Sequence, residues 1–259
     1  MRKISLKKVL GQNSLTILAD TNLRTLLCQD VAMPGKNKRL DFSPSLASRL
    51  ILFLVRWRAQ VPGWRVQTMA QLARSELDGI QVIESVVHDV SDRRIRLTLE
   101  KHLQDERRHA RVFSERLSAL QRDAGMPAAP PPAGRHDAQE FSLLTLVAYL
   151  ETQEARAIPL LETYAELYAG DTESVYWIEK NIADEIFHAT WTHRQLERWI
   201  EEGRGAEVAK ARALARQLDR RAFWLQLFAF LKVAPRLVAS GYFPVLRRKP
   251  ASMELQLDG

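Results

Sequence analysis

The stretch LQDERRHARVF (residues 103–113) decides the fold, because it places a carboxylate and an imidazole on the apolar face of a predicted helix. Ala110 and Phe113 follow Glu106 at steps of four and three residues, which is the spacing of a buried helical stripe. His109 lies about one turn from Glu106 on the same face. Burying an unpartnered carboxylate costs several kcal/mol, so a glutamate at this place is paired, exposed or bound to a metal. The rest of the chain decides between these readings.

The composition is that of a folded protein with little thiol chemistry. The chain has 259 residues, of which 46% are hydrophobic, and this is enough for one large domain or two small ones with a sizeable core. A single cysteine, Cys28, excludes an internal disulfide and a Cys-rich zinc or rubredoxin-like site. This cysteine usage fits a reducing compartment, and we expect a cytoplasmic protein.

The net charge of +7 is concentrated towards the two ends of the chain. Residues 1–40 contain eight Lys or Arg against two acids, and residues 203–250 contain eleven against two. No zinc finger, RNA-binding signature or Gly-rich loop accompanies these basic regions, so no nucleic-acid partner is expected. An anionic membrane surface or an acidic protein partner suits them.

Three stretches bear on export and membrane insertion. The basic start MRKISLKK (1–8) is not followed by a sustained apolar run, so we expect no signal peptide. LILFLVRW (50–57) is too short to span a bilayer. The stretch 222–246 is long enough, but two charged residues and a proline interrupt it. We expect an amphipathic or capping segment there, which either covers the bundle or contacts a membrane peripherally.

Beyond Pro62 the apolar residues follow a helical period. Turn and breaker residues divide this part into five expected helices, at 65–89, 92–124, 138–169, 173–203 and from 206 to a limit at Pro235, with Ser91 as a candidate N-cap of the second. The Pro-rich PAAPPPAG (127–134) forms a long linker between the second and third helices, whereas tight turns join the other pairs. The sequence therefore predicts an all-α fold in which two antiparallel hairpins and a long crossover make a four-helix bundle.

We expect three regions along the chain. Residues 1–62 form an N-terminal extension with one helix packing on the bundle, residues 63–203 form the bundle, and residues 204–259 form a basic and apolar helical extension.

Each of the four bundle helices carries acids within its predicted buried stripe. The second and fourth helices repeat Glu-x-x-His, and the first and third contribute further glutamates. The set consists of Glu76, Glu106 with His109, Glu151 and Glu154, and Glu185 with His188. These residues lie about 14 to 20 positions from the turn of their hairpin, so they can converge on one slab of the interior.

Metal binding explains why these side chains would converge. Carboxylates and imidazoles suit iron and manganese, and the charge of four carboxylates balances two divalent cations. One Glu from each of two helices with Glu-x-x-His from the other two is the donor set of di-iron and di-manganese carboxylate bundles. The remaining alternative is a polar seam of hydrogen-bonded pairs that binds no metal.

Two motifs resemble the ferritin-like non-haem di-iron carboxylate superfamily, over about residues 65–203. DERRH (105–109) resembles the Asp-Glu-x-Arg-His motif of bacterial multicomponent monooxygenase hydroxylases. DEIFH (184–188) resembles the partner motif shared with ribonucleotide reductase small subunits. The resemblance implies a ferritin-like four-helix bundle of the oxygen-activating branch.

The resemblance also implies a role for each residue. Glu106 and Glu185 would be the catalytic carboxylates that bridge the metals, and Glu76 and Glu151 would be terminal ligands. His109 and His188 would each bind one iron. Asp105 and Asp184 would accept hydrogen bonds from these imidazoles. The gap of 34 residues between Glu151 and Glu185 matches the gap in the oxygen-activating branches, and it favours Glu151 over Glu154 as the ligand. The distance from the turn slightly favours Glu154, which stays as the alternate or supporting ligand.

Several features depart from these families. Phe113 stands four residues after the first ligand histidine, where ribonucleotide reductases have their radical tyrosine, and this argues against a stable radical of that type. The chain is also far shorter than a multicomponent hydroxylase subunit. The histidines outside the two motifs are expected at the surface or in packing roles: His88, His102, His136 and His193.

Two functions follow from these observations. The first is a di-iron oxidase or oxygenase that uses O2 to hydroxylate, N-oxygenate or desaturate an organic substrate, lipid-like or carrier-bound. It requires two Fe ions (a Mn or mixed Fe/Mn pair also suits the donors), O2 as co-substrate and an electron donor such as a ferredoxin or reductase. Further expected partners are an acyl carrier protein, a membrane surface and a second copy in a homodimer. The alternative function is metal handling by a ferroxidase or peroxidase that needs no organic substrate.

Overall fold

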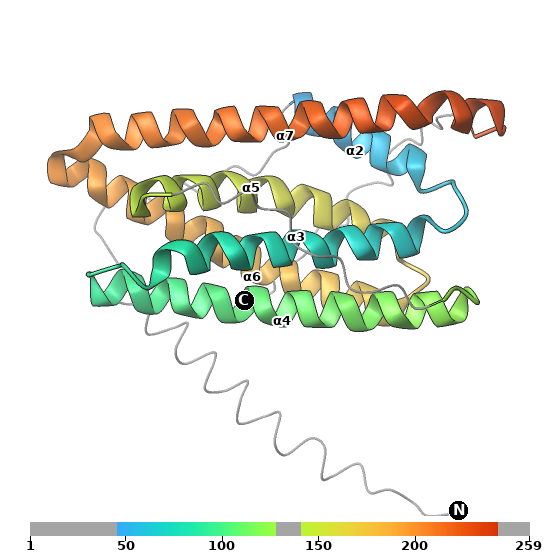
Figure 1. Ribbon diagram of the computed structural model, residues 1–259, viewed down its shortest axis with the longest axis horizontal. Coiled ribbons are helices and arrows are strands. Elements are labelled where there is room, and N and C mark those ends of the chain that lie inside the picture. Colours follow the sequence, from blue (N-terminus) through green and yellow to red (C-terminus); the bar gives the residue numbers. More distant parts are fainter. Residues whose placement is uncertain (1–45, 128–140, 243–259) are drawn as a thin grey trace, which may run out of the picture. The chain divides into compact units, whose positions relative to one another are not determined.

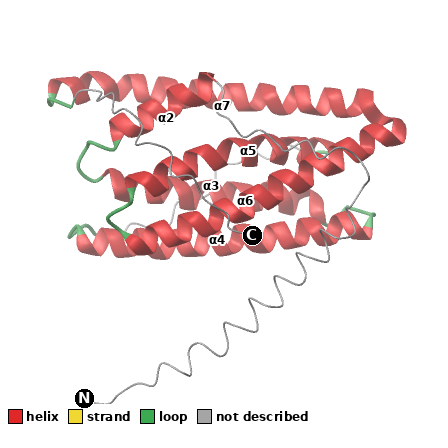
Figure 2. Ribbon diagram, turned by 180° about the vertical axis from the view of Figure 1, so that it is seen from behind, coloured by secondary structure: helices red, strands yellow, loops and turns green. Residues whose placement is uncertain are grey.

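The computed structural model describes residues 46–127 and 141–242, and all secondary structure within these ranges is helical (Figures 1 and 2). The predicted all-α class is confirmed for this part of the chain. In chain order the helices are α2 (Leu46–Arg58), α3 (Trp64–Val87), α4 (Arg93–Asp123), α5 (Leu143–Leu167), α6 (Thr172–Trp199), the short π-helix η1 (Ile200–Arg204) and α7 (Gly205–Ala239). Residues 1–45 of the predicted N-terminal extension and most of the Pro-rich linker lie outside the described ranges.

Two hairpins form the centre of the structure, α3 with α4 and α5 with α6. Short turns join the helices of each pair, and an aspartate caps the second helix of each. The Asp92 carboxylate accepts hydrogen bonds from the backbone N–H groups of Arg94 and Ile95, and the Asp171 carboxylate accepts one from Ser174. Ser91 is therefore not the N-cap of α4, because the helix begins one residue later than predicted.

The apolar core has two parts, and a polar layer separates them. One cluster contains Val82 and Ile83 of α3 with Leu99 of α4, and the other contains Met69 of α3 with Phe113 of α4. On α5 and α6 the two clusters likewise lie on opposite sides of a short polar interval. All four helices thus change from apolar to polar and back at the same level.

Helix α7 packs along α5, and α2 contacts both of them. In the two opposite views α7 and α4 occupy opposite edges of the helical assembly (Figures 1 and 2). Gly203, with φ of 89°, lets the chain turn from α6 into α7, because this left-handed backbone conformation strains residues that have a Cβ. The predicted limit at Pro235 is wrong, since α7 continues through this exposed residue to Ala239. Water can hydrate the backbone carbonyl that the proline leaves without an N–H partner.

Candidate metal centre

Among the residues that the structure describes, seven side chains that could bind a metal meet in the polar layer between the two apolar clusters. They come from all four hairpin helices, and each is at least 90% buried. They are Glu76 of α3; His102, Glu106 and His109 of α4; Glu154 of α5; and Glu185 and His188 of α6. The groups could hold metal ions, and they fall into two sets that share Glu106.

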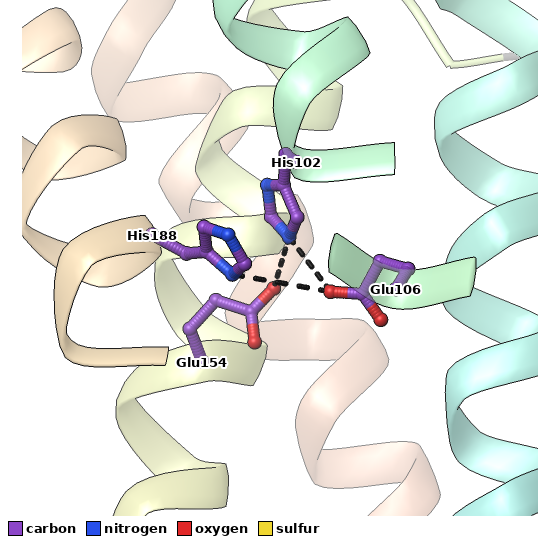
Figure 3. A group of neighbouring side chains, drawn as sticks. All are labelled: His102, Glu106, Glu154 and His188. Atoms are coloured by element: carbon purple, nitrogen blue, oxygen red, sulfur yellow. Dashed lines mark hydrogen bonds and ion pairs between the residues drawn. The ribbon is translucent and has the colours of Figure 1, made fainter. Parts of the chain in front are cut away.

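The first set has two imidazoles and two carboxylates (Figure 3). The His102 Nε2 atom lies 2.9 Å from Glu106 Oε1 and 3.3 Å from Glu154 Oε1. The His188 Nδ1 atom lies 3.9 Å from the same Glu106 oxygen. The two imidazole rings stack with their centroids 3.6 Å apart. One donor atom from each of the four side chains lies within 4.8 Å of the other three.

The second set has one imidazole and three carboxylates. His109 Nδ1 lies 3.6 Å from Glu76 Oε2 and 3.7 Å from Glu185 Oε1, and it has no hydrogen-bond partner although it is buried. Glu106 completes the set. A buried imidazole nitrogen that faces carboxylates and has no hydrogen-bond partner is the arrangement expected of a metal ligand.

Two carboxylates lie between the sets. Glu106 belongs to both, and Glu185 reaches His188 Nδ1 at 3.4 Å as well as His109. In an octahedral site with bonds of about 2.1 Å, neighbouring donors are about 3 Å apart and opposite donors about 4.2 Å apart. The separations in both sets are close to these values, so the residues present fit a pair of metal ions.

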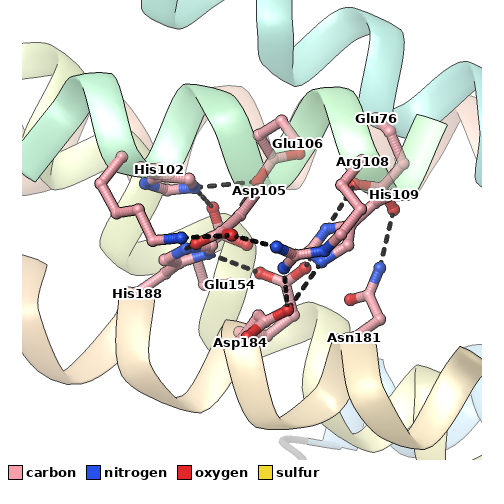
Figure 4. Close-up of polar contacts among 12 residues, drawn as sticks. Glu76, His102, Asp105, Glu106, Arg108, His109, Glu154, Asn181, Asp184 and His188 are labelled. Carbon is pink, nitrogen blue, oxygen red and sulfur yellow. Dashed lines mark hydrogen bonds and ion pairs between the residues drawn. The ribbon is translucent and has the colours of Figure 1, made fainter. Parts of the chain in front are cut away.

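A second layer of charged groups orients two of the imidazoles (Figure 4). His109 Nε2–H donates to Asp184 Oδ2 at 3.0 Å, and His188 Nε2–H donates to Asp105 Oδ2 at 3.4 Å. In both cases Nδ1 is the ring atom that points towards the carboxylates, and it would be free to bind a metal when Nε2 carries the ring's single proton. Arg108 joins the two aspartates, with 2.7 Å from Nη1 to Asp105 and 2.5 Å from Nη2 to Asp184.

The charge of Asp105 in this second layer is firmly fixed. Burial alone would raise the pKa of Asp105, but the hydrogen bond from His188 and the charges of Arg108 and Lys101 outweigh it and hold the pKa of Asp105 well below its usual range. Asp105 is therefore ionised at all working pH values. It can stabilise a positive charge that develops on the His188 side of the centre.

The donor carboxylates carry an excess of negative charge for a buried site. Burial and the neighbouring charge of Glu76 raise the pKa of Glu106 to about 8, against the hydrogen bond with His102. Burial and Glu154 raise the pKa of Glu185 well above its usual range. Without a metal the cluster is thus balanced by retained protons. Cations would replace these protons.

The pKa values of His102 and His188 are shifted in opposite directions. Burial lowers the pKa of His102, but its hydrogen bonds with Glu106 and Glu154 outweigh this and raise the pKa to about 9. Burial and the proximity of His102 lower the pKa of His188 to about 4, against its hydrogen bond with Asp105. At neutral pH His188 is therefore a neutral imidazole, which is the form that binds a metal.

The sequence-based choice of Glu151 over Glu154 is corrected by the structure. Glu154 lies in the first set, whereas Glu151 lies outside the centre, where it binds His193 Nδ1 at 2.8 Å and the Arg212 guanidinium at 2.7 and 3.0 Å. Glu151 precedes Glu154 by three residues, so the two side chains leave the helix in directions about 60° apart. Glu154 points into the bundle interior, and Glu151 points towards α7. Burial alone would raise the pKa of Glu151, but these two partners lower it.

His102 does not lie at the surface, which was one of the two roles expected for it; the structure places it among the candidate metal donors. His102 is buried in the first set and contacts two donor carboxylates. The signal was present in the sequence, because His102, Glu106 and His109 are spaced at i, i+4 and i+7 and so share one helix face. The other predicted donors and the two aspartates lie in or directly beside the centre.

Two features define the space around the centre. Gly79 of α3 faces Glu106, and a Cβ at position 79 would lie 3.1 Å from Glu106 Oε2. The glycine therefore makes room for the shared carboxylate. A cavity of about 10 Å³ lies against His109, with Phe113 and Trp177 in its lining. It has room for one molecule of the size of water.

Comparisons with known proteins add no family assignment. No protein-family model, no curated protein and no solved structure matches the chain.

Proposed function

We propose that the chain is a ferritin-like non-haem di-iron protein that uses O2 to oxidise an organic substrate. The observation that carries the proposal is the convergence of seven buried donors on two positions that share Glu106. The supporting helices form two hairpins, with one donor glutamate each on α3 and α5 and Glu-x-x-His on α4 and α6. This distribution is typical of ferritin-like dimetal carboxylate bundles.

Each side chain has a defined role in this proposal. Glu76 and His109 would hold one ion, and His102, Glu154 and His188 would hold the other. Glu106 and Glu185 would lie between them. The four carboxylates match the charge of two divalent ions, and oxygen with imidazole donors favours iron or manganese. When bound, such a pair supplies the electrons and the Lewis acidity for reactions of O2.

The protein's own residues prepare the centre for that chemistry. Asp184 and Asp105 hold the protons of His109 and His188 on Nε2, so that Nδ1 is free to bind. Arg108 fixes both aspartates and so couples the two positions. The surrounding apolar clusters exclude water, which strengthens the electrostatic interactions at the centre.

The burial of the donors favours a resident cofactor over a transported metal. A ferroxidase must release its iron repeatedly, whereas here each donor is at least 90% buried. We therefore place the oxidase or oxygenase first and the ferroxidase or peroxidase second. The proposed reaction also requires an electron donor and an organic substrate. The cavity beside His109 is too small for such a substrate unless its lining side chains move.

Anaerobic loading with Fe(II), followed by O2 and then by further Fe(II), tests the proposal. We expect oxidation to stop after about two Fe(II) per chain, and we expect the oxidised iron to stay bound in the presence of a chelator. Continued oxidation of added Fe(II) would establish the metal-handling function instead. Absence of any stoichiometric binding would leave the polar seam as the correct interpretation of the cluster.

A further inference from the structure

The last part of α7 carries an apolar stripe that faces away from the rest of the described structure. Trp224, Leu225, Phe228 and Leu231 are 52%, 62%, 56% and 52% exposed, respectively. Their spacing places them along one side of the helix, and the exposed Val238 extends it. At 1.5 Å per residue this stripe is about 21 Å long. Four neighbouring large apolar side chains with this exposure indicate an interaction surface.

The packing face of α7 is a different one. Ala211, Ala215 and Leu237 are buried, and Phe230 contacts the ring of Trp57 on α2 with centroids 5.2 Å apart. The N-terminal half of the helix is fixed to the bundle through Arg212, which binds Glu151. The exposed stripe is therefore not needed to attach α7 to its own protein.

Positive charge surrounds the stripe. Arg220, Arg221, Lys232 and Arg236 are all exposed, and residues 220–239 contain no Asp or Glu. The acid that precedes this segment, Asp219, pairs with Arg156 at 2.8 Å. The surface thus combines aromatic and leucine side chains with cations, as helices that lie in the interface of an anionic bilayer do.

We propose that the outer face of α7 docks on an anionic lipid bilayer and lies flat in its interface. The continuous helical stretch Thr172–Ala239 contains a segment long and apolar enough to cross a membrane. Two observations favour the flat orientation: one side of α7 packs on α5 and α2, and Lys232 and Arg236 interrupt the apolar run. The charge selects anionic over zwitterionic lipid. This inference does not rest on the metal centre.

Flotation of the full-length protein with lipid vesicles tests the inference. The vesicles are phosphatidylcholine alone or mixed with phosphatidylglycerol. We expect binding to the mixed vesicles only, and weakening by salt. The double variant Leu225→Ser/Phe228→Ser removes apolar contact, and Arg220→Gln/Arg221→Gln removes charge. Each should lower the partition coefficient by about tenfold or more.

The matched control is Leu97→Ser, because Leu97 is 49% exposed but lies on α4, at the opposite edge from α7. It should bind vesicles like the wild type. All variants should keep the wild-type unfolding temperature, which shows that a loss of binding is not a loss of fold. Equal binding to both kinds of vesicle, binding to neither, or a stable dimer that the Leu225/Phe228 variant abolishes would each overturn the proposal.

Discussion

Replacement of the shared carboxylate by its neutral isostere, Glu106→Gln, should have opposite effects with and without metal. In the metal-free protein the variant should be more stable than the wild type, because it removes a buried acid from a cluster with excess negative charge. In the presence of Mn(II) the wild type should be the more stable protein, because only the carboxylate can join the two metal positions.

The size of the first effect follows from the pKa of Glu106. A carboxyl whose pKa is higher in the folded than in the unfolded chain destabilises the fold at every pH above the unfolded value. For Glu106 the pKa rises from 4.5 to about 8 through burial and the charge of Glu76. Folding at pH 7 therefore requires proton uptake, which costs about 3 kcal/mol. Glutamine removes this cost but weakens the 2.9 Å hydrogen bond with His102, a loss of about 1–2 kcal/mol. The net stabilisation is about 1–2 kcal/mol, or about 2–8 °C in Tm.

Thermal unfolding with a chelator and with excess Mn(II) measures both effects. The control is Glu151→Gln, which alters a carboxylate on α5 outside the centre and should leave the Mn(II)-induced rise in Tm unchanged. Suppose instead that Glu106→Gln lowers Tm equally in both buffers, while Mn(II) does not change the Tm of the wild type. The cluster would then be a hydrogen-bonded seam without a metal, and the reasoning would be refuted.

Three further expectations concern the surroundings of the centre. Gly79→Ala should raise the free energy of unfolding of the metal-free protein by up to about 1 kcal/mol through helix propensity. It should also weaken Mn(II) binding, because its Cβ displaces the Glu106 carboxylate; unchanged affinity in a metal titration would contradict this. As the pH rises from 6.5 to 9, the metal-free protein should lose stability. The raised pKa values of His102 (about 9) and Glu106 (about 8) make the folded state bind more protons than the unfolded chain. Denaturant midpoints that stay constant or rise across this range would contradict this expectation. Arg212→Met should detach α7 from Glu151 and increase amide hydrogen exchange in α7, with metal stoichiometry unaltered; simultaneous loss of metal would mean that Glu151 belongs to the centre.

The helical elements could be predicted because local signals agree with the tertiary structure. The glycine at 203 and the aspartate at 171 marked real boundaries, since backbone conformation and capping depend on neighbouring residues. The end of α7 could not be read in this way. A proline inside a helix removes one hydrogen bond and crowds the carbonyl four residues earlier, and the helix continues through it only where packing and hydration offset this cost. Exposure at Pro235 depends on how α7 packs, which no local pattern indicates.

The cluster of candidate metal donors was predictable to the extent that its residues follow one helix face. Glu106 and His109 share such a face with His102, which was nevertheless assigned to packing because the Glu-x-x-His motif does not include it. The choice between Glu151 and Glu154 depended on information from outside the helix. The partner that holds Glu151 is Arg212 on α7, and no pattern within α5 indicates this long-range pairing.

The central claim is that two ions bind side by side and share Glu106. Electron paramagnetic resonance of the metal-free full-length protein, titrated with Mn(II), tests it most directly, because two Mn(II) ions joined by a carboxylate are magnetically coupled. We predict a coupled spectrum that reaches its maximum at about two Mn(II) per chain and is lost in Glu106→Gln. A spectrum of isolated or free Mn(II) at every ratio, in the wild type, would contradict the claim.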